Sequence, residues 1–414
     1  RGMSWADAFA RVPALLVAHV EISLAAILLA LVIALPLAIW ARHSPAVARV
    51  TLGFASLVQT IPSLALLALF YPLLVGLQAL LGSWISPLGF LPSLLALFLY
   101  ALLPILRNAI TGLNGVDPAL VEAAEGLGMN ARQRLTMVEA PLAAPTIMAG
   151  IRTAAVWTIG AATLATTVGQ PSLGDLIFAG LQTQNWTLVL AGCLASAALA
   201  FVVDALLGLI EHGIAEWQHR WRRWSVWAAA ALLGAGLLAA TAPRLLPSGE
   251  RPIVVGAKGF GEQYILSRLI GRRLAAAGYA VRYRDGLGSA VIFRALNDGE
   301  IDVYVDYAGT LWTNEMKRPG TAPRERMLPG IAQWLKRETN VRSLGPLGFE
   351  NAYAFAMRGE DARELGVDSL ADLARVSRRL TFGTDPEFLE RPEWANVQRA
   401  YPIRFAAVRS LSPT

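Results

Sequence analysis

The chain has 414 residues, 55% hydrophobic and only 16% charged, whereas about 25% charged is typical of a soluble domain. This composition excludes an ordinary soluble protein, and the single cysteine, Cys193, excludes an intrachain disulfide and a cysteine metal cluster. The net charge of +6 comes mostly from arginine, without the basic stripe and interleaved aromatic residues of a nucleic-acid surface. We therefore expect a membrane protein with no metal site, no cofactor and no nucleic-acid partner.

Charge is distributed unevenly along the chain. Residues 1–245 contain no lysine, and all three lysines (Lys258, Lys317 and Lys336) follow residue 250, where the composition is that of a globular domain. The segment 241–251 is rich in proline, glycine and charge and lacks periodicity. We predict a transmembrane domain over 1–240, a linker over 241–251 and a water-exposed domain over 252–414.

The first domain contains several apolar runs near the length of about 20 residues that a bilayer core requires. Internal prolines predict kinks in some of these helices. The expected fold is an α-helical polytopic membrane domain with about six spans, over residues 15–40, 50–75, 89–112, 142–168, 187–210 and 226–242.

Arginine placement predicts the orientation of these spans. Arg42 and Arg49 follow the first span, Arg132 and Arg134 lie between the third and fourth, and the Trp- and Arg-rich segment 217–224 follows the fifth. The alternate loops, 76–88 and 169–186, contain no lysine or arginine. By the positive-inside rule the arginine loops are cytoplasmic, so the domain after the sixth span is extracytoplasmic.

The longest predicted cytoplasmic connection, residues 113–141, reads "LNGVDPALVEAAEGLGMNARQRLTMVEAP". Asp117 and Pro118 predict the start of a short helix, which Gly126 or Gly128 can end in a left-handed cap. A second short helix is expected to stop before Pro141. Two short helices joined by a glycine turn suit the groove of a partner protein, although a solvated loop remains the simpler alternative.

This segment resembles the EAA loop of ABC-transporter permeases, whose pattern is Glu-Ala-Ala, three residues, Gly, nine residues, Ile, one residue, Leu-Pro. The matching residues are Glu122, Ala123, Ala124, Gly128, Val138, Ala140 and Pro141. The resemblance implies a type I importer permease of a bacterial inner membrane, working as a homodimer, in which these residues couple to a cytoplasmic ATPase. The lysines do not stand in a phosphate-binding Gly-x4-Gly-Lys-Ser/Thr loop, so ATP hydrolysis is expected in a separate subunit and this chain is not expected to be an enzyme. The first two spans are similar to the osmoprotectant branch of the family.

The second half alternates strand and helix patterns, which predicts an α/β fold with a parallel sheet. In such sheets ligands bind at the carboxyl ends of the strands, here within 257–263 and 305–310. One helix, 261–278, carries an apolar stripe formed by Ile265, Leu266, Leu269, Ile270 and Leu274. The expected elements are strands 252–258, 279–283 and 301–307, helices 261–278 and 289–299, and then a strand in 349–357, a helix in 368–376 and a strand with loop in 379–389.

Three blocks in this half are "GAKGFGEQYIL" (256–266), "GEIDVYVDYAGT" (299–310) and "LGFENAYA" (347–354). They resemble extracytoplasmic binding proteins for quaternary ammonium compounds such as glycine betaine, choline and carnitine. The resemblance implies a two-lobed, periplasmic-binding-protein-like domain fused to its permease. Domains of that kind are longer than 252–414, so we expect an incomplete second lobe.

A trimethylammonium group donates no hydrogen bonds, and its charge is best met by electron-rich ring faces. Tyr307 and Tyr353, both at predicted strand ends and both matching family tyrosines, are the expected cage walls, and Phe260 and Tyr264 are weaker candidates. Core packing is the alternative for each ring.

Polar groups beside the cage would contact the rest of the ligand. Gln263 is expected to hold a carboxylate or hydroxyl near a helix N-terminus. Asp306 either attracts the cation or caps the next helix. Gly259 and Gly261 replace two polar residues of the family pattern, so the choice among osmolytes, or ergothioneine, stays open.

Two other classes of function are alternatives to an importer. A ligand-gated channel or a membrane receptor could carry the same kind of sensor domain but would have no use for an EAA-spaced loop. An intramembrane enzyme would need a nucleophile and a base, and His19 has no serine or acid arranged around it in the sequence.

Overall fold

The computed structural model describes residues 4–81, 85–182, 184–215, 231, 252–318, 322–350, 353–384, 388–389 and 391–410. The chain divides into two compact units: Arg1–Pro252 with Arg284–Gly288, and Ile253–Tyr283 with Ser289–Thr414. Apart from residue 231, the predicted sixth span, the linker 241–251 and the Trp- and Arg-rich segment 217–224 lie outside the described residues.

The described part of the first unit is helical. Its elements are α1 (Trp5–Phe9), α2 (Val12–His43), α3 (Pro45–Thr60), α4 (Ser63–Leu81), α5 (Phe90–Asn114), α6 (Pro118–Gly126), α7 (Ala131–Arg134), the π-helix η1 (Leu135–Glu139), α8 (Ala140–Ala162), the 3-10 helix η2 (Thr163–Val168), α9 (Gly174–Gln182) and α10 (Trp186–Ala215). Four helical segments are long and apolar enough to cross a membrane: Trp5–His43, Phe90–Asn114, Ala131–Val168 and Trp186–Gly213. They correspond to the first, third, fourth and fifth predicted spans.

The second predicted span, 50–75, is not one helix. It consists of α3 and α4, which meet at a bend of 103°. Ile61 at the bend is extended, with φ −79° and ψ 126°, because the ring of Pro62 disfavours a helical conformation in the preceding residue. The Tyr100 hydroxyl on α5 donates to the Ile61 carbonyl and so satisfies a backbone group freed by the break.

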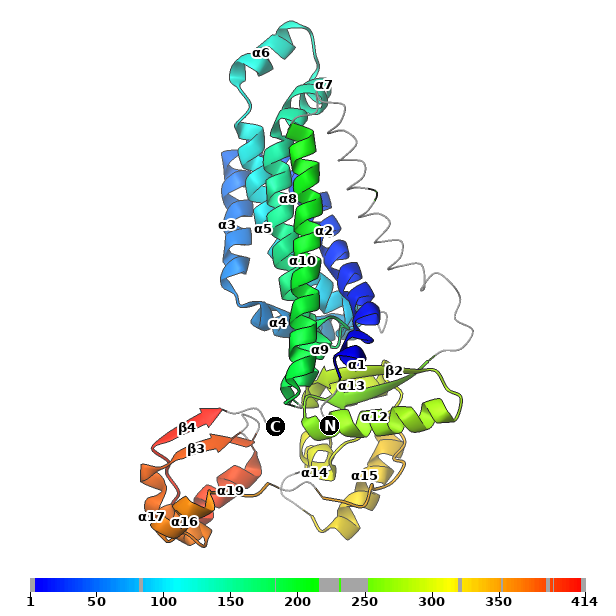
Figure 1. The fold of residues 1–414 in the computed structure, drawn as a ribbon, viewed down its shortest axis with the longest axis vertical. Helices are drawn as coiled ribbons and strands as arrows, with labels where there is room; N and C mark the ends of the chain where they lie inside the picture. The colour runs from blue at the N-terminus through cyan, green and yellow to red at the C-terminus, as the bar shows by residue number, and fades with distance from the viewer. Residues whose placement is uncertain are drawn as a thin grey trace. The chain divides into compact units, whose positions relative to one another are not determined.

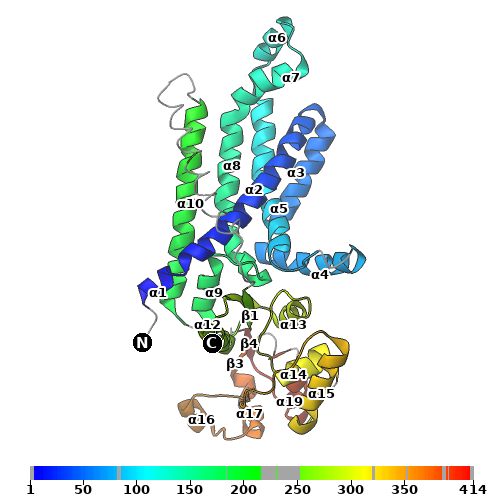
Figure 2. The same cartoon turned by 90° about the vertical axis from the view of Figure 1, so that its right-hand side faces the viewer.

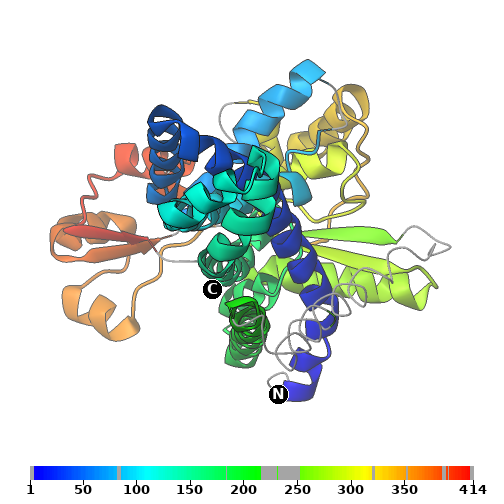
Figure 3. The ribbon, with the colours of Figure 1, turned by 90° about the horizontal axis from the view of Figure 1, so that it is seen from above.

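Small residues let the long helices pack closely. Ala26, Ala30, Ala34 and Ala38 repeat every four residues along α2 and are completely buried. Small side chains allow helix backbones to approach, which is the usual basis of helix association in membranes. The helices α2, α5, α8 and α10 run alongside one another (Figure 1), with α3 and α10 on opposite sides of α5 and α8 (Figures 2 and 3).

An ion-pair network joins α8 to α10. The Arg152 guanidinium donates from Nε to Asp204 Oδ1 (2.5 Å), from Nη2 to Asp204 Oδ2 (2.8 Å) and from Nη1 to Glu211 Oε2 (3.2 Å). Gly208 lies between the two acids on α10, and a Cβ there would stand 3.2 Å from Arg152 Cζ, so a larger residue would crowd the guanidinium. Charges inside a membrane are rare unless they are paired in this way.

His19 on α2 is a structural residue. It is completely buried, its Nε2 lies 2.9 Å from the Ile159 carbonyl oxygen, and its Nδ1 accepts from the Leu173 backbone N–H at 3.3 Å. A neutral imidazole satisfies both contacts at once, with the proton on Nε2. The ring thus holds together the region where α8 gives way to η2 and α9.

The second unit begins with β1 (Ile253–Lys258), α12 (Gly261–Ala276), β2 (Val281–Leu287), α13 (Ser289–Asn297), α14 (Ala308–Thr310), the π-helix η3 (Leu311–Glu315) and α15 (Arg324–Glu338). The strands β1 and β2 are hydrogen-bonded neighbours. Predicted strand 301–307 forms only a parallel bridge between Val303 and Val255, flanked by the Gly256 N–H bond to the Val303 carbonyl (2.8 Å). This pairing brings the residues after Val303 alongside the end of β1.

The predicted helix 261–278 is confirmed as α12, and its apolar stripe is partly buried. Ile265 and Leu269 are 60% and 55% exposed and the other three stripe residues are half-buried, whereas the buried residues of α12 are Gln263, Tyr264, Ser267 and Gly271. Gly271 lets α12 approach β2 closely, because a Cβ there would overlap the ring and hydroxyl of Tyr283. The most buried face of α12 is therefore the one that carries Gly271.

The remaining elements are α16 (Gly359–Leu365), α17 (Leu370–Val376), the 3-10 helix η4 (Ser377–Arg379), β3 (Thr381–Thr384), α19 (Pro392–Ala400) and β4 (Ala407–Ser410). Strands β3 and β4 pair in parallel from Thr381–Ala407 to Thr384–Ser410. The predicted helix 368–376 and the strand in 379–389 are confirmed. The predicted strand in 349–357 is wrong for the described residues 353–357, which have no regular structure. Phe355 instead stacks on Phe382, with ring centroids 5.6 Å apart, in an aromatic core.

Candidate functional site

A buried charge cluster lies where β1 ends. Lys258, the last residue of β1, donates from Nζ to Asp306 Oδ1, and the Tyr304 hydroxyl donates to Asp306 Oδ2. The Lys258 and Asp306 side chains are only 1% and 7% exposed. The bridge between Val255 and Val303 sets the register that places Asp306 at Lys258. The Asp306 carboxylate therefore already has a buried countercharge.

Together with burial, the Asp306 carboxylate also raises the pKa values of two neighbouring groups, Tyr304 and Glu315. Burial, together with the Asp306 charge and hydrogen bond, raises the pKa of the Tyr304 phenol far above its usual range, so this hydroxyl remains a donor. Burial and the Asp306 charge also raise the pKa of Glu315 above its ordinary value. Asp306 also accepts the Tyr307 backbone N–H at 2.7 Å, which fixes the next residue.

Tyr307, one expected cage wall, is oriented by α12. Its hydroxyl donates to Glu262 Oε2 at 2.8 Å, and its ring centroid lies 5.5 Å from Lys258 Nζ. This distance is within the range of a cation–π contact, about 6 Å. The ring is half-buried and held at both its hydroxyl and its backbone. Among the predicted residues, the structure thus brings Tyr307 to the N-terminal turn of α12 and Asp306 to the end of β1.

The other candidates on this segment lie at the start of α12. Phe260 is the N-cap residue and is half-buried, and Tyr264 is buried in the core. Gln263 is almost completely buried, and its Nε2 has no hydrogen-bond partner within the described part of the chain. A buried amide without a partner is unfavourable by about 1–3 kcal/mol, so a ligand oxygen at this point would satisfy it.

Tyr353 belongs to a different set of contacts. It is half exposed, its ring centroid lies 4.6 Å from that of Phe388, and Arg391 Cζ lies 5.4 Å from the Tyr353 centroid. Its ring is therefore packed against the aromatic core that also contains Phe355 and Phe382. Its role as a second cage wall stays a prediction.

The loop 113–141, which we call the coupling loop, forms two short helices as expected. The Asp117 side chain accepts the Ala119 N–H at 2.9 Å and caps α6, with Pro118 in its first turn. Gly128 is left-handed, with φ 79°, and the Met129 N–H bonds to the Ala124 carbonyl at 3.1 Å. Of the motif residues, Ala124 is buried, whereas Glu122 and Ala123 are exposed on α6.

The second helix of the coupling loop does not stop before Pro141. It runs from α7 through the π-helix η1 into α8, and Pro141 lies in the first turn of α8. Proline lacks a backbone N–H and clashes with the carbonyl four residues earlier. The wider i to i+5 turn of η1, in which the Ala140 N–H bonds to the Leu135 carbonyl, lets the helix continue past this residue.

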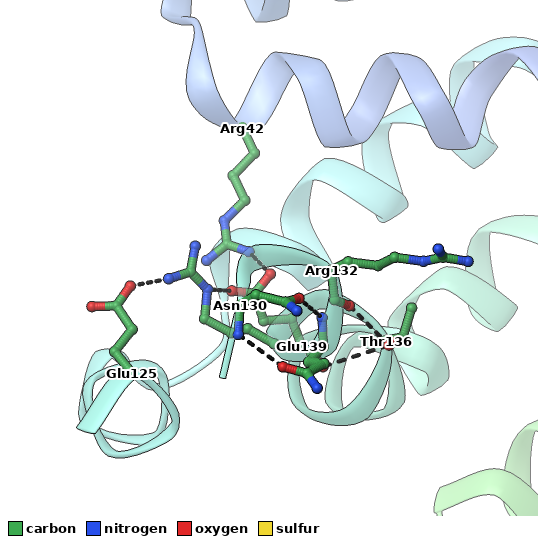
Figure 4. Close-up of polar contacts among 8 residues, drawn as sticks. Arg42, Glu125, Asn130, Arg132, Thr136 and Glu139 are labelled. Atoms are coloured by element: carbon green, nitrogen blue, oxygen red, sulfur yellow. Dashed lines mark hydrogen bonds and ion pairs between the residues drawn. The ribbon is translucent and has the colours of Figure 1, made fainter. Parts of the chain in front are cut away.

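A chain of charges connects the coupling loop to α2 (Figure 4). Glu139, at the end of η1, accepts from Arg42 of α2 and, at 3.1 Å, from Nε of Arg134. Arg134 also donates to Glu125 on α6. Asn130 and Gln133 form a reciprocal capping box that starts α7, the short helix on which Arg134 lies, with both hydrogen bonds at 2.9 Å.

The sequence-based prediction of site residues missed Glu139, Lys258 and Glu262. Signals for two of them were present. Lys258 is one of only three lysines and precedes the predicted ligand segment, and Glu139 occupies the free position of the EAA pattern between Val138 and Ala140. Apart from Arg134, which pairs with Glu139, their partners Arg42, Asp306 and Tyr307 are about 45 to 100 residues away in the chain, so these pairings could not be derived from local pattern.

Comparisons with known proteins agree with the two-part organisation. A family model described as the inner membrane component of binding-protein-dependent transport systems matches residues 24–216. A model described as the substrate binding domain of ABC-type glycine betaine transport systems matches residues 251–410.

Several relatives match at the level of sequence. An ergothioneine transport permease/ergothioneine binding protein of Helicobacter pylori is 32% identical over 398 residues, which cover 92% of this chain and 69% of that protein. A glycine betaine/carnitine/choline transport system permease protein of Bacillus subtilis is 40% identical over 196 residues, 47% of this chain and 85% of that protein. An inward-facing structure of the MetNI methionine ABC transporter aligns with 18% identity and a TM-score of 0.41, over 48% of this chain and 93% of that chain.

These relatives are transport proteins rather than enzymes, and in ABC importers ATP hydrolysis belongs to a separate subunit. The channel, receptor and intramembrane-enzyme alternatives are therefore set aside. Because the Helicobacter relative aligns with both parts of the chain, the chain belongs to the family of ABC-importer subunits in which an inner-membrane permease is fused to a substrate-binding domain.

Proposed function

We propose that this subunit imports a small molecule that carries a trimethylammonium group, and that ergothioneine is the first candidate. The relatives named for glycine betaine, carnitine and choline support the chemical class. Ergothioneine is ranked first because the relative that aligns with both parts of the chain is named for it. All these compounds present a permanent cation that donates no hydrogen bond, so ring faces are its best partners.

The observation that carries this proposal is the setting of Tyr307. Its ring is fixed by the 2.8 Å hydrogen bond to Glu262 and by the backbone bond to Asp306. Because Lys258 is near the ring already, the ligand cation would use a part of the ring that faces away from that ammonium. The Glu262 carboxylate places a negative charge at the hydroxyl end of the ring. Each desolvated cation–π contact of this kind is worth about 2 kcal/mol.

Gln263 is proposed to bind the opposite, anionic end of the ligand. Its buried Nε2 is a donor without a partner among the described residues, and it follows Glu262 in the first turn of α12. Glycine betaine, carnitine and ergothioneine each carry a carboxylate, whereas choline carries a hydroxyl. Phe260, Tyr264 and Tyr353 are retained as further candidates for the wall of the site.

We propose that the coupling loop faces the cytoplasm and that the binding domain is extracytoplasmic. Arg42, Arg132 and Arg134 support this orientation. Arg42 and Arg134 both contact Glu139, and Arg132 lies on the same short helix as Arg134, so all three arginines are at the coupling loop (Figure 4). A sixth span over 226–242 would carry the chain back across the membrane. A homodimer with two ATPase subunits is the expected assembly.

The coupling loop is proposed to dock on the cytoplasmic ATPase. Leu120, Leu127 and Met137 are exposed there, and Leu127 is 79% exposed. If these side chains form one patch, it would be the kind of exposed apolar surface that a partner protein covers. Glu122, Ala123, Ala124, Gly128 and Pro141 are the residues that we expect to form or position this surface.

Uptake into proteoliposomes tests the proposal. The chain and its ATPase would be reconstituted and supplied with labelled ergothioneine, glycine betaine, carnitine or choline, with and without ATP on the side of the membrane that holds the ATPase. We expect ATP-dependent accumulation of at least one of them. Accumulation of none, with uptake of a ligand that lacks a quaternary ammonium group, would overturn the proposal.

A further inference from the structure

Glu139 is buried in the coupling loop, although it is not among the residues of the EAA pattern. Its side chain is only 3% exposed, whereas the other acids on the helices of this loop, Glu122 and Glu125, are exposed. It ends the π-helix η1, the turn between α7 and α8 that is wider than an α-helical turn. Such π-turns are frequent at functional sites, because they redirect a side chain without ending the helix.

Glu139 is the meeting point of two arginines from different parts of the permease. Arg134 comes from the coupling loop itself, whereas Arg42 comes from the last turn of α2. Arg134 extends the chain to Glu125 on α6. The order α6–Glu125–Arg134–Glu139–Arg42–α2 is thus a continuous sequence of alternating charges (Figure 4).

The chain of charges reaches a helix that the coupling loop does not reach through the backbone. The loop is joined covalently to α5 and α8, whereas α2 ends at His43, and α3, α4 and α5 lie between it and the loop in sequence. The same α2 carries the buried alanine stripe and His19, so its position affects the packing of the bundle. A displacement of α6 would therefore change the position of α2 if Glu139 holds both arginines.

We infer that Glu139 is the positioning residue that couples movement of the ATPase-docking helix α6 to α2. The inference rests on the proposed function, because it takes the coupling loop as the ATPase contact. Burial makes the two pairs of Glu139 the strong part of the link, because removing one member of a buried ion pair leaves an uncompensated charge. The outer pair, Arg134 with the exposed Glu125, contributes less. A contiguous chain of ion pairs can carry energetic coupling between distant sites when it has two discrete arrangements.

The test uses the complete chain with its ATPase in proteoliposomes and compares Glu139→Gln, Arg42→Gln and the double variant with the native chain. Arg132→Gln is the matched control, because Arg132 is exposed on α7 and its guanidinium points away from Glu139 (Figure 4). The readouts are ATPase co-purification, basal ATP hydrolysis and substrate taken up per ATP hydrolysed. Arg42→Gln leaves the Arg134 contact in place, so it remains informative if Glu139→Gln impairs assembly.

We expect both single variants to retain the ATPase and its basal activity but to lose about tenfold in uptake per ATP, a middle value for couplings between contacting residues. The double variant is expected to lose no more uptake per ATP than the poorer single variant, since both substitutions interrupt the same chain of charges. Native-like uptake per ATP in Arg42→Gln, additive losses in the double variant, or an equal loss in Arg132→Gln would each overturn the inference. Failure of the native chain to transport any trimethylammonium compound would instead count against the proposed function. The same variants would then be compared by how strongly the true substrate stimulates their ATP hydrolysis.

Discussion

The Lys258 ammonium donates to the Asp306 carboxylate at the point where β1 ends, and both side chains are shielded from solvent. The parallel bridge between Val255 and Val303 brings these residues together from positions 48 apart in the chain. Through the backbone bond from Tyr307 to Asp306, the same pair fixes the residue that we propose as a cage wall. We therefore expect folding and ligand binding to be linked at this pair.

Replacing Lys258 with methionine should destabilise the binding domain, because Asp306 would remain buried without its countercharge. Loss of one partner of a buried pair typically costs about 3–5 kcal/mol. Limited proteolysis of the full chain in detergent measures the effect, since cleavage follows the population of the opened domain. Lys336→Met, at an exposed position on α15, is the control. Equal cleavage rates for the two variants would show that the pair does not stabilise the fold.

Two substitutions of Tyr307 separate the contribution of its ring to ligand binding from that of its hydroxyl. Tyr307→Leu removes the ring face and should weaken ligand binding by about 30-fold, equivalent to about 2 kcal/mol. Tyr307→Phe keeps the ring but loses the bond to Glu262, and a smaller loss, under about tenfold, is expected for one hydrogen bond. Calorimetric titration measures both, with the exposed Tyr279→Leu as the control. Native affinity in Tyr307→Leu would exclude Tyr307 from the cage.

Gly128 is expected to be required for its backbone conformation rather than for space. Its φ of 79° is unfavourable for residues with a Cβ by about 1–2 kcal/mol, yet a Cβ at this position would meet nothing within 4 Å. Gly128→Val should therefore reduce ATPase co-purification and substrate-stimulated hydrolysis, while Gly128→Asn should retain most of both. Gly126→Ala, also in open space but without a positive φ, is the control. A valine variant that couples normally would contradict a role for this turn.

Arg152 is expected to hold α8 against α10. Arg152→Gln leaves Asp204 and Glu211 without their shared partner in the bundle. An unpaired acid within a membrane span is unfavourable, by up to about 2.5–3.5 kcal/mol at the centre of the span on insertion scales. A lower thermal transition of the detergent-solubilised chain would report this loss. Glu211→Gln should have a smaller effect, since its single bond is longer than the two bonds to Asp204. The reverse order of effects would contradict the geometry.

Much of the membrane domain could be predicted from sequence because a bilayer imposes a simple length and polarity rule. Four of the predicted spans are single helical segments, and the Asp117 cap and the Gly128 turn are confirmed. The exception, 50–75, bends by 103° next to Pro62, one of the internal prolines that predict kinks, and Ile61 before it is extended. Proline effects on neighbouring residues therefore decide where an apolar run bends.

The binding domain was less predictable, since its packing depends on contacts between distant residues. The apolar stripe of α12 predicted the helix but did not reveal its most buried face, which carries Gly271 against the Tyr283 ring, while Ile265 and Leu269 are exposed. The segment after Tyr353 has a strand-like pattern, but its phenylalanine packs into an aromatic core without strand pairing. The partners of Asp306 and Glu139 likewise come from other elements.

The central claim is that the binding domain recognises a trimethylammonium cation. The most direct measurement is calorimetric titration of the full chain with ergothioneine, glycine betaine, carnitine and choline, each paired with an isostere in which a tert-butyl group replaces the trimethylammonium group and the rest of the molecule is unchanged. We predict that at least one of the four compounds binds and that its isostere, of similar size but without the positive charge, binds about 30-fold more weakly. Equal affinity for a compound and its tert-butyl isostere, or no binding of any of the four compounds, would contradict the account.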